Sequence, residues 1–267
     1  MDFASYLKNT ATELNIKTQK LLSNWIKEVR LINKELLPLT SKFADACYGG
    51  KQVRGILVRL GYGLVKARPN PEIITVGAAY EILHASILVH DDIMDQSPLR
   101  RGEPSLYKTL GESMAMALGD LGFFLSIKII LGSKFDQALK LKALALFTKT
   151  LVDTAVGQIM DLKKLDPVTT AKLKTARYTI AAPLQLGATL AGGKDKQVKL
   201  LGEFGEYVGI AFQIRDDILD GEAQENAKEK AQEYASRAKK MIPKITEDQV
   251  MMKILQEMVD YLVERTA

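Results

Sequence analysis

Two short motifs, each with three aspartates behind an apolar run, have the composition and spacing of a metal-bound phosphate site. They read "LVHDDIMD" and "FQIRDDILD". On a helix, the first and last Asp of each motif lie on one side, a turn apart, and the middle one lies about 100° round. The helix dipole is negative at this C-terminal end, so the acids need a positive partner such as a hard divalent cation shared with phosphate oxygens. The six predicted Mg²⁺ ligands are Asp91, Asp92, Asp95, Asp216, Asp217 and Asp220.

One such motif alone is also compatible with a solvated acidic helix end. Two of them, each behind a long apolar helix, favour a metal site. Bundle cores commonly house metals, so motifs that face each other across a bundle would hold several Mg²⁺ ions and a diphosphate. Everything else in the interpretation depends on these two motifs converging.

Basic residues that suit phosphate occur in two segments, of which the second adjoins the first acidic motif. "GGKQVRG" sets Lys51 and Arg54 three residues apart after two glycines, which allow a tight turn and close backbone approach. "RRG" follows the first motif with Arg100 and Arg101, and the planar guanidinium suits bidentate phosphate contacts. Without the aspartates nearby, such an arginine pair would be read as a solvated loop.

Histidines also come near the first motif. His84 precedes Asp91 by seven residues, two helical turns, and so lies on roughly the same face. A lone His on an apolar helix is either a satisfied core residue or a ligand, and both interpretations stay open for His84. His90 is interpreted as structural.

Polar residues on apolar helices accompany the second motif. Lys174 and Thr175 open an apolar helix that Pro183 is expected to kink. Gln213, three residues before Asp216, falls in a buried stretch. A buried amide needs partners, so Gln213 either packs against backbone or faces the cavity.

The apolar spacing that must position these residues is helical almost throughout. Segments such as 21–36 and 248–265 repeat apolar residues at three- and four-residue steps, and Gly, Pro or capping residues separate about ten such segments. We find no Gly/Ser linker and no short-period repeat. The sequence therefore predicts an all-α fold, a single helix-bundle domain over residues 1–267.

Composition narrows the partners and the compartment. The net charge is +5, without a basic stripe interleaved with aromatics, so nucleic acid is not expected. The single Cys47 cannot form an internal disulfide, and the N-terminus lacks the pattern of a secretory signal. The longest uncharged run, residues 178–193, falls short of a membrane span. We expect a soluble cytoplasmic protein.

From about residue 45 to residue 221, the chain resembles the trans-type, head-to-tail prenyl diphosphate synthases. The likeness comprises, in matching order, "GGKQVRG", "EILHASILVHDDIMD", "LRRGEPSLYK", "GDLGFFLS", "GQIMDL", "KT" and "FQIRDDILD". It implies the all-α isoprenoid synthase fold around a central cavity. It also implies a Mg²⁺-assisted condensation of isopentenyl diphosphate with an allylic prenyl diphosphate.

The resemblance also implies a role for each motif residue. Asp91, Asp95 and Asp216 would hold Mg²⁺ on the allylic diphosphate, and Asp92, Asp217 and Asp220 would be secondary or water-mediated ligands. The residues expected near the allylic diphosphate or the nascent cation are Arg100, Lys174, Thr175 and Gln213. Those expected to bind isopentenyl diphosphate are Lys51, Arg54, His84 and Arg101.

Product length and assembly follow from the same resemblance. Residues one or two turns before the first motif form a floor under the growing chain, here Ser86 and Ile87 with Leu83 a turn deeper. Because no aromatic stands at 86 or 87, we expect a product of twenty carbons or more. Family members are commonly homodimers.

One departure from the family bears on activity. After the second motif the family has a long loop, rich in Gly and Lys, that closes over the allylic diphosphate. This chain passes from Asp220 almost directly into "EAQENAKEKAQEYASRAKKM", a predicted amphipathic helix in which Lys228 or Lys230 could replace the loop lysine. Two alternatives therefore stay open: a catalytically weak or regulatory subunit of a heteromeric synthase, and a terpene synthase of the same fold.

Overall fold

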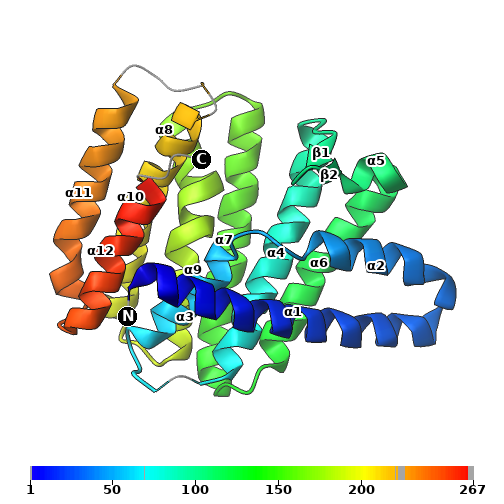
Figure 1. Cartoon of the computed structure of the whole chain (residues 1–267), viewed down its shortest axis with the longest axis horizontal. Coiled ribbons are helices and arrows are strands. Elements are labelled where there is room, and N and C mark those ends of the chain that lie inside the picture. The colour runs from blue at the N-terminus through cyan, green and yellow to red at the C-terminus, as the bar shows by residue number, and fades with distance from the viewer. Residues whose placement is uncertain (1, 69, 220, 222–225, 264–267) are drawn as a thin grey trace. The chain divides into compact units, whose positions relative to one another are not determined.

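The computed structural model describes residues 2–68, 70–219, 221 and 226–263, and nearly all of these are helical (Figure 1). The prediction of an all-α fold is confirmed. The elements, in chain order, are α1 (Phe3–Ile32), η1 (Lys34–Leu36), α2 (Leu37–Ala46), α3 (Val53–Gly63), α4 (Glu72–Met94), β1 (Leu99–Arg100), β2 (Glu103–Pro104), α5 (Leu106–Leu110), α6 (Glu112–Gly132), α7 (Gln137–Leu162), α8 (Pro167–Ala171), η2 (Lys172–Ala181), α9 (Ala182–Leu190), α10 (Asp195–Leu219), α11 (Ala227–Ile245) and α12 (Gln249–Val263).

The chain divides into two compact units, each built from several stretches of sequence. One contains residues 1–9, 57–73 and 135–267, and the other contains residues 10–56 and 74–134. The first acidic motif belongs to the second of these units, and the second motif belongs to the first. Their convergence across a cavity, and the single domain over residues 1–267, stay predictions.

In the unit with the first motif, α4 packs among α1, α2 and α6. Trp25 of α1 meets Phe43 of α2 edge-to-face, with ring centroids 6.1 Å apart. Both belong to a buried cluster with Ile82 of α4 and Leu125 of α6. Helix α6 comes close to α4 at Gly122, where a Cβ atom would lie 1.9 Å from Ser86 Oγ. Only a glycine permits this approach, which fixes α4 and the motif at its end.

In the unit with the second motif, α10 contacts η2, α9, α11 and α12. Three glycines along α10 face the η2–α9 segment. A Cβ atom on Gly205 would lie 2.4 Å from Ala181 Cα, and one on Gly209 would lie 2.5 Å from Ala176 Cα. The backbones of α10 and η2 therefore touch, which brings the elements that carry Gln213 and Lys174 together.

Segment 172–181 is a π-helix, not the kinked α-helix that Pro183 predicted. The N–H group of Ala182 donates to the carbonyl of Arg177, five residues back, which is the π-helical pattern. Pro183 lies in the first turn of α9, where a missing N–H group is tolerated. The local irregularity at this position is thus a widened helix, and it contains Lys174 and Thr175.

Two helices, α4 and α6, are long and apolar enough to cross a membrane by length and composition. Neither helix is an uncharged run, because both contain charged residues. In α4, 72% of the 18-residue apolar stretch is buried inside the protein, as in a core helix. In α6, only 39% of the corresponding stretch is buried. Helix α6 therefore presents much of its apolar surface outward.

Candidate functional site

The first acidic motif ends α4, and its middle residue is neutralised. Asp92 is buried and accepts hydrogen bonds from Arg100 of β1, from Nε at 2.9 Å and also from Nη2. The backbone N–H of Asp95 donates to the carbonyl of Asp91 at 2.8 Å, so these two lie one turn apart on one side. Asp91 is partly buried and Asp95 is exposed. Asp91 and Asp95 are therefore the pair of this motif best placed for a cation.

The turn between β1 and β2 places Arg101 on the glycines of "GGKQVRG". Arg101 and Gly102 have φ angles of +55° and +82°, as a tight hairpin turn requires. The Arg101 guanidinium donates from Nη1 to the carbonyl of Tyr48 at 2.5 Å. A Cβ atom on Gly50 would lie 2.9 Å from Nη2 of Arg101, so the glycine makes room for this cation.

Around His84, the predicted cations gather in one place. Burial and then the charges of Arg54, Arg101 and Arg100 hold the pKa of His84 well below its ordinary value, so the imidazole is neutral at pH 7. The structure thus brings together four of the predicted residues, which come from three separate motifs. Lys51 is exposed in the loop before α3.

A buried carboxylate that the sequence did not indicate supports this cluster. Glu81, one turn before His84, accepts a hydrogen bond from the N–H group of Gly55 at 2.6 Å. Burial raises the pKa of Glu81, and the charge of Arg54 opposes that rise. A buried acid inside "EILH" was the available signal, because such a residue needs a partner.

The residues of the predicted floor face different surroundings. Ser86 is buried against Gly122 of α6, and its Oγ donates to the carbonyl of Ile82 at 3.1 Å. Leu83 is also fully buried, whereas Ile87 is partly exposed. Of the three, Ile87 is the side chain best placed to meet a growing chain.

A cavity of about 530 Å³ borders the arginine pair on the side of α2. Asp92, Arg100 and Arg101 line it, together with Lys42 of α2 and Leu88 of α4. Its lining combines three cations with the carboxylates of Asp45, Asp92 and Glu103 and an apolar wall, so the formal charges of the lining cancel.

The second motif ends α10 in the same manner. Asp216 and Asp217 lie in the last turn, and Asp217 Oδ1 accepts a hydrogen bond from Gln213 Nε2 at 2.8 Å. Gln213 therefore faces the motif, and does not pack solely against backbone. Asp220, the third residue of the motif, lies outside the described residues.

The π-helix supplies the basic residue of this half. Lys174 Nζ lies 2.7 Å from Asp161 Oδ2 at the end of α7. A Cβ atom on Gly157 would lie 2.4 Å from the Lys174 backbone nitrogen, so α7 and η2 are in close contact there. No role was predicted for Asp161, although it lies within "GQIMDL", one of the motifs that carry the resemblance. Thr175 follows Lys174 in the same helix.

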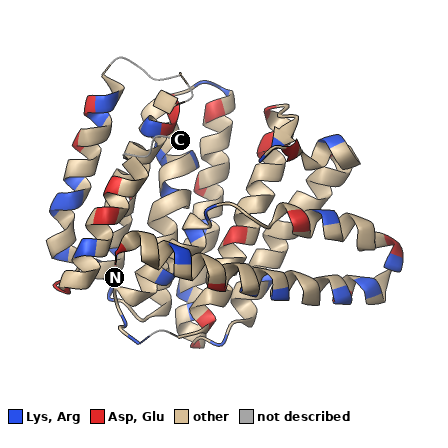
Figure 2. Cartoon of the chain, viewed as in Figure 1, with Lys and Arg blue, Asp and Glu red and all other residues tan. Residues whose placement is uncertain are grey.

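The predicted charged, amphipathic helix is confirmed as α11. It begins at Ala227 and buries small and apolar residues along one side, while acidic and basic side chains alternate on the rest (Figure 2). Only residues 220–226 separate it from α10. That this connection is shortened relative to the family stays a prediction.

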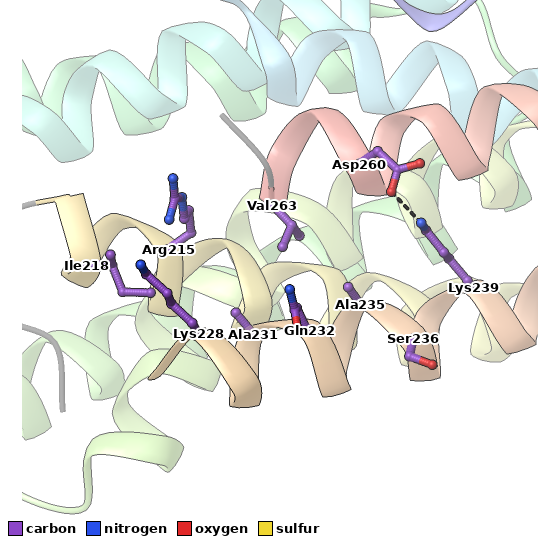
Figure 3. A pocket seen from close by; sticks show the side chains of 10 residues that line it. All are labelled: Arg215, Ile218, Lys228, Ala231, Gln232, Ala235, Ser236, Lys239, Asp260 and Val263. Atoms are coloured by element: carbon purple, nitrogen blue, oxygen red, sulfur yellow. Dashed lines mark hydrogen bonds and ion pairs between the residues drawn. The ribbon is translucent and has the colours of Figure 1, made fainter. Parts of the chain in front are cut away.

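A groove of about 600 Å³ lies between α10, α11 and α12 (Figure 3). Lys228 lines it with Arg215 and Ile218 of α10. At 100° per residue, these two α10 residues lie on the other side of the helix from Gln213 and Asp216. Lys228 therefore lines the far side of α10, which does not support the expectation that it replaces the loop lysine. Lys230 is exposed.

The aspartates of the two motifs offer oxygen donors, which fits Mg²⁺. Among the described residues, no group of three or more His, Cys, Asp or Glu side chains is arranged to hold a metal ion. Mg²⁺ is typically bound through one or two carboxylates and completes its shell with water and substrate phosphates. Asp91 and Asp95, one turn apart at the end of α4, match that requirement. Asp216 is the corresponding acid in the last turn of α10.

Comparison with known proteins gives one consistent result. The sequence profile described as polyprenyl synthetase matches residues 38–261. Over 188 residues, the chain is 35% identical to a geranylgeranyl diphosphate synthase of Sulfolobus acidocaldarius, covering 66% of this chain and 56% of the relative. Over 184 residues, it is 36% identical to heptaprenyl diphosphate synthase component 2 of Geobacillus stearothermophilus, covering 64% and 54%. The chain spans about half the length of the curated relatives it matches.

The fold comparison agrees. The chain superimposes on a solved geranylgeranyl pyrophosphate synthetase from Geoglobus acetivorans with a TM-score of 0.83 and 25% identity, over 97% of this chain and 99% of that one. The isoprenoid synthase fold that the resemblance implied is therefore confirmed.

Proposed function

The chain belongs to the polyprenyl synthetase family, and from that premise we propose that it is a trans-prenyltransferase. It would condense isopentenyl diphosphate with an allylic prenyl diphosphate to give a longer trans-prenyl diphosphate. The observation that carries the proposal is the assembly of Arg54, His84, Arg100 and Arg101 beside the first acidic motif. A cationic cluster next to paired carboxylates suits two diphosphates, one held directly and one through metal.

The allylic diphosphate belongs with the aspartates. Bound Mg²⁺ would neutralise the departing diphosphate and make an allylic carbocation accessible. The carboxylates of Asp91, Asp95 and Asp216 would hold the Mg²⁺. Arg100 neutralises the charge of Asp92. Lys174 would exchange part of its contact with Asp161 for the diphosphate, and Gln213 orients Asp217.

Isopentenyl diphosphate belongs with the second cluster. Arg54 and Arg101 supply fixed positive charge, and neutral His84 can donate a hydrogen bond to a phosphate oxygen. Lys51 would close this site from the loop before α3. The double bond of isopentenyl diphosphate then attacks the allylic cation, and the proton that is lost passes to the released diphosphate. No nucleophilic side chain is required.

The product and the assembly are parts of the same proposal. Ile87 is partly exposed and no aromatic residue stands at position 86 or 87, which supports a product of twenty carbons or more. The relative named as a geranylgeranyl diphosphate synthase agrees with that length. Exposed apolar residues on α7, namely Leu141, Val152 and Ile159, support a homodimer. The buried, unpaired Cys47 is in keeping with a cytoplasmic location.

The test is an elongation assay on the purified full chain with Mg²⁺, labelled isopentenyl diphosphate and allylic primers of increasing length. We expect labelled prenyl diphosphates longer than the primer, and none when the metal is chelated. Diphosphate release without label incorporation would instead indicate a terpene synthase. Binding without turnover would indicate a non-catalytic subunit.

A pair of variants on one helix controls this assay. Asp216→Asn removes a proposed metal ligand and should lower turnover by roughly 100-fold or more, the scale of a lost electrostatic group. Asp195→Asn changes an exposed acid in the first turn of the same helix and should leave turnover within about twofold. Equal effects of the two variants would argue against a metal role for the second motif.

A second candidate, a subunit of a heteromeric synthase, rests on two observations. The connection between α10 and α11 is short. In addition, one of the relatives is named as component 2 of a heptaprenyl diphosphate synthase. If this candidate is right, the purified chain alone elongates poorly and gains activity when a partner chain is added.

A further inference from the structure

Arg177 joins three helices through two carboxylates. Its Nε donates to Glu206 Oε1 of α10 at 2.7 Å, and its Nη1 donates to Asp153 Oδ2 of α7 at 2.9 Å. Arg177 itself lies in the middle of the π-helix η2. All three side chains are less than one-third exposed. The planar guanidinium thus bridges α7 and α10, and its fixed fork of donors suits two separate carboxylates.

Two lysines extend this bridge into a network of alternating charge. Lys172 Nζ lies 2.8 Å from Glu206 Oε2, and Lys149 Nζ lies 2.7 Å from Asp153 Oδ2. Each carboxylate therefore receives two donors. Burial alone would lower the pKa of Arg177, but the bonds and charges of Glu206 and Asp153 raise it. Such a network orders side chains more strongly than an isolated surface pair.

The π-helix depends on its neighbours for its conformation. A run of i→i+5 bonds is rare and forms mostly as a single turn, so ten π-helical residues require external support. Gly157 of α7 and Gly209 of α10 bring their backbones against Lys174 and Ala176 from two sides. These contacts fix the distance of η2 from its neighbours, and the Arg177 network opposes its rotation about its own axis.

The network is in register with the residues proposed to serve the allylic substrate. Arg177 follows Lys174 by three residues, Glu206 precedes Gln213 by seven, and Asp153 precedes Asp161 by eight. Seven residues are about two α-helical turns, so Glu206 and Gln213 lie on nearly the same face of α10. Lys174 and Arg177 of η2 both donate to carboxylates of α7, those of Asp161 and Asp153. A rotation of η2 that broke the network would also move Lys174.

We propose that Arg177, held by Asp153 and Glu206, is a positioning residue that fixes the π-helix so that Lys174 and Thr175 keep their place beside Gln213. The inference rests on the proposed prenyl transfer, in which those residues serve the allylic substrate. Arg177 acts through the backbone of η2 and through α10, and it does not itself touch substrate.

The test replaces Arg177 with Met, which keeps an unbranched side chain but removes the charge and both hydrogen bonds. Turnover with the allylic primer should fall about 10- to 100-fold, the cost of a small misplacement of reacting groups. The KM for isopentenyl diphosphate should stay within about twofold, because its proposed site lies elsewhere in the chain. Amide hydrogen exchange in residues 172–181 should become faster. Arg177→Lys, which can bond only one carboxylate well, should be intermediate.

Arg237→Met is the matched control. Arg237 also pairs with a glutamate, Glu233, but on the more exposed surface of α11. This variant should leave both turnover and exchange in 172–181 unchanged. The proposal is overturned if folded Arg177→Met keeps wild-type turnover and exchange, or if Arg237→Met causes equal losses. If Arg177→Met does not fold, Glu206→Gln replaces it with the same expectations. An inactive wild-type chain would contradict the proposed prenyl transfer. Amide hydrogen exchange in the variants would still decide whether Arg177 holds η2.

Discussion

His84 illustrates how burial, together with three neighbouring arginines, sets the charge of one side chain. Its pKa lies below the ordinary value in the folded chain, chiefly through burial and then through Arg54, Arg101 and Arg100. In the unfolded chain it titrates at about 6.5. As the pH falls through about 6.5, the unfolded chain therefore binds more protons than the folded one, and stability decreases.

We expect the unfolding free energy to decrease as the pH is lowered from about 7.5 to about 6. His84 contributes a slope of at most about 1.4 kcal/mol per pH unit. Urea titrations across this window measure it. His84→Gln should flatten the dependence, whereas His90→Gln should retain it, since His90 is the chain's other histidine. A slope that survives in His84→Gln would show that the imidazole is not held neutral by its surroundings.

Residue types at the site could be predicted from the sequence, but partners could not. Spacing placed His84 and Arg101 near the first motif, because helical periodicity and chain adjacency limit where they lie, and the family resemblance added Arg54. Asp92 pairs with Arg100, and Lys174 pairs with Asp161. These pairs depend on tertiary contacts, which local sequence patterns do not contain. Asp153, Glu206 and Arg177 gave no signal for the same reason.

At the scale of the elements, α10 depends on its glycines. A Cβ atom on Gly209 would lie 2.5 Å from Ala176 Cα, which is backbone and cannot move aside alone. Gly209→Ala should therefore separate α10 from η2 and lower the unfolding free energy by about 1–3 kcal/mol. Denaturant unfolding measures this.

Gly132→Ala is the control for that substitution. Gly132 ends α6, and no atom lies within 4 Å of an added Cβ. Alanine there should be neutral or stabilise by at most about 1 kcal/mol through helix propensity. If Gly209→Ala proved as harmless as Gly132→Ala, the close contact between α10 and η2 would be wrong.

Helix existence was predictable from periodicity, but helix type was not. The three- and four-residue apolar repeats indicated helices along almost the whole chain, and the Gly and Pro breaks located most of their ends. Pro183 led to an expected kink because a proline removes a hydrogen bond. The π-helix before it arises from packing of η2 against α7 and α10, which a local pattern does not contain. The two-residue strands at Leu99–Arg100 and Glu103–Pro104 are too short to give a period-2 signal.

At the scale of the whole molecule, an apolar stripe on α7 is exposed to water. Leu141, Val152 and Ile159 are each more than half exposed, although they lie on one side of a long helix. Helix α6 has a comparable stripe of Met116, Phe124 and Leu131. Exposed apolar stripes of this length are typical of subunit interfaces, since monomeric proteins seldom leave them in water.

A charge placed in the α7 stripe should therefore separate the proposed homodimer. Val152→Glu would leave an unpaired carboxylate in a desolvated interface, which costs several kcal/mol when no partner is present. The variant should sediment as a monomer at concentrations where the wild type sediments as a dimer. Val250→Glu is the matched control, because Val250 is also about half exposed but lies at the start of α12, and its sedimentation should match the wild type. A wild type that is monomeric throughout, or a Val152→Glu variant that stays dimeric, would remove α7 from the interface. Elongation by a monomeric Val152→Glu would further show that each chain contains a complete site.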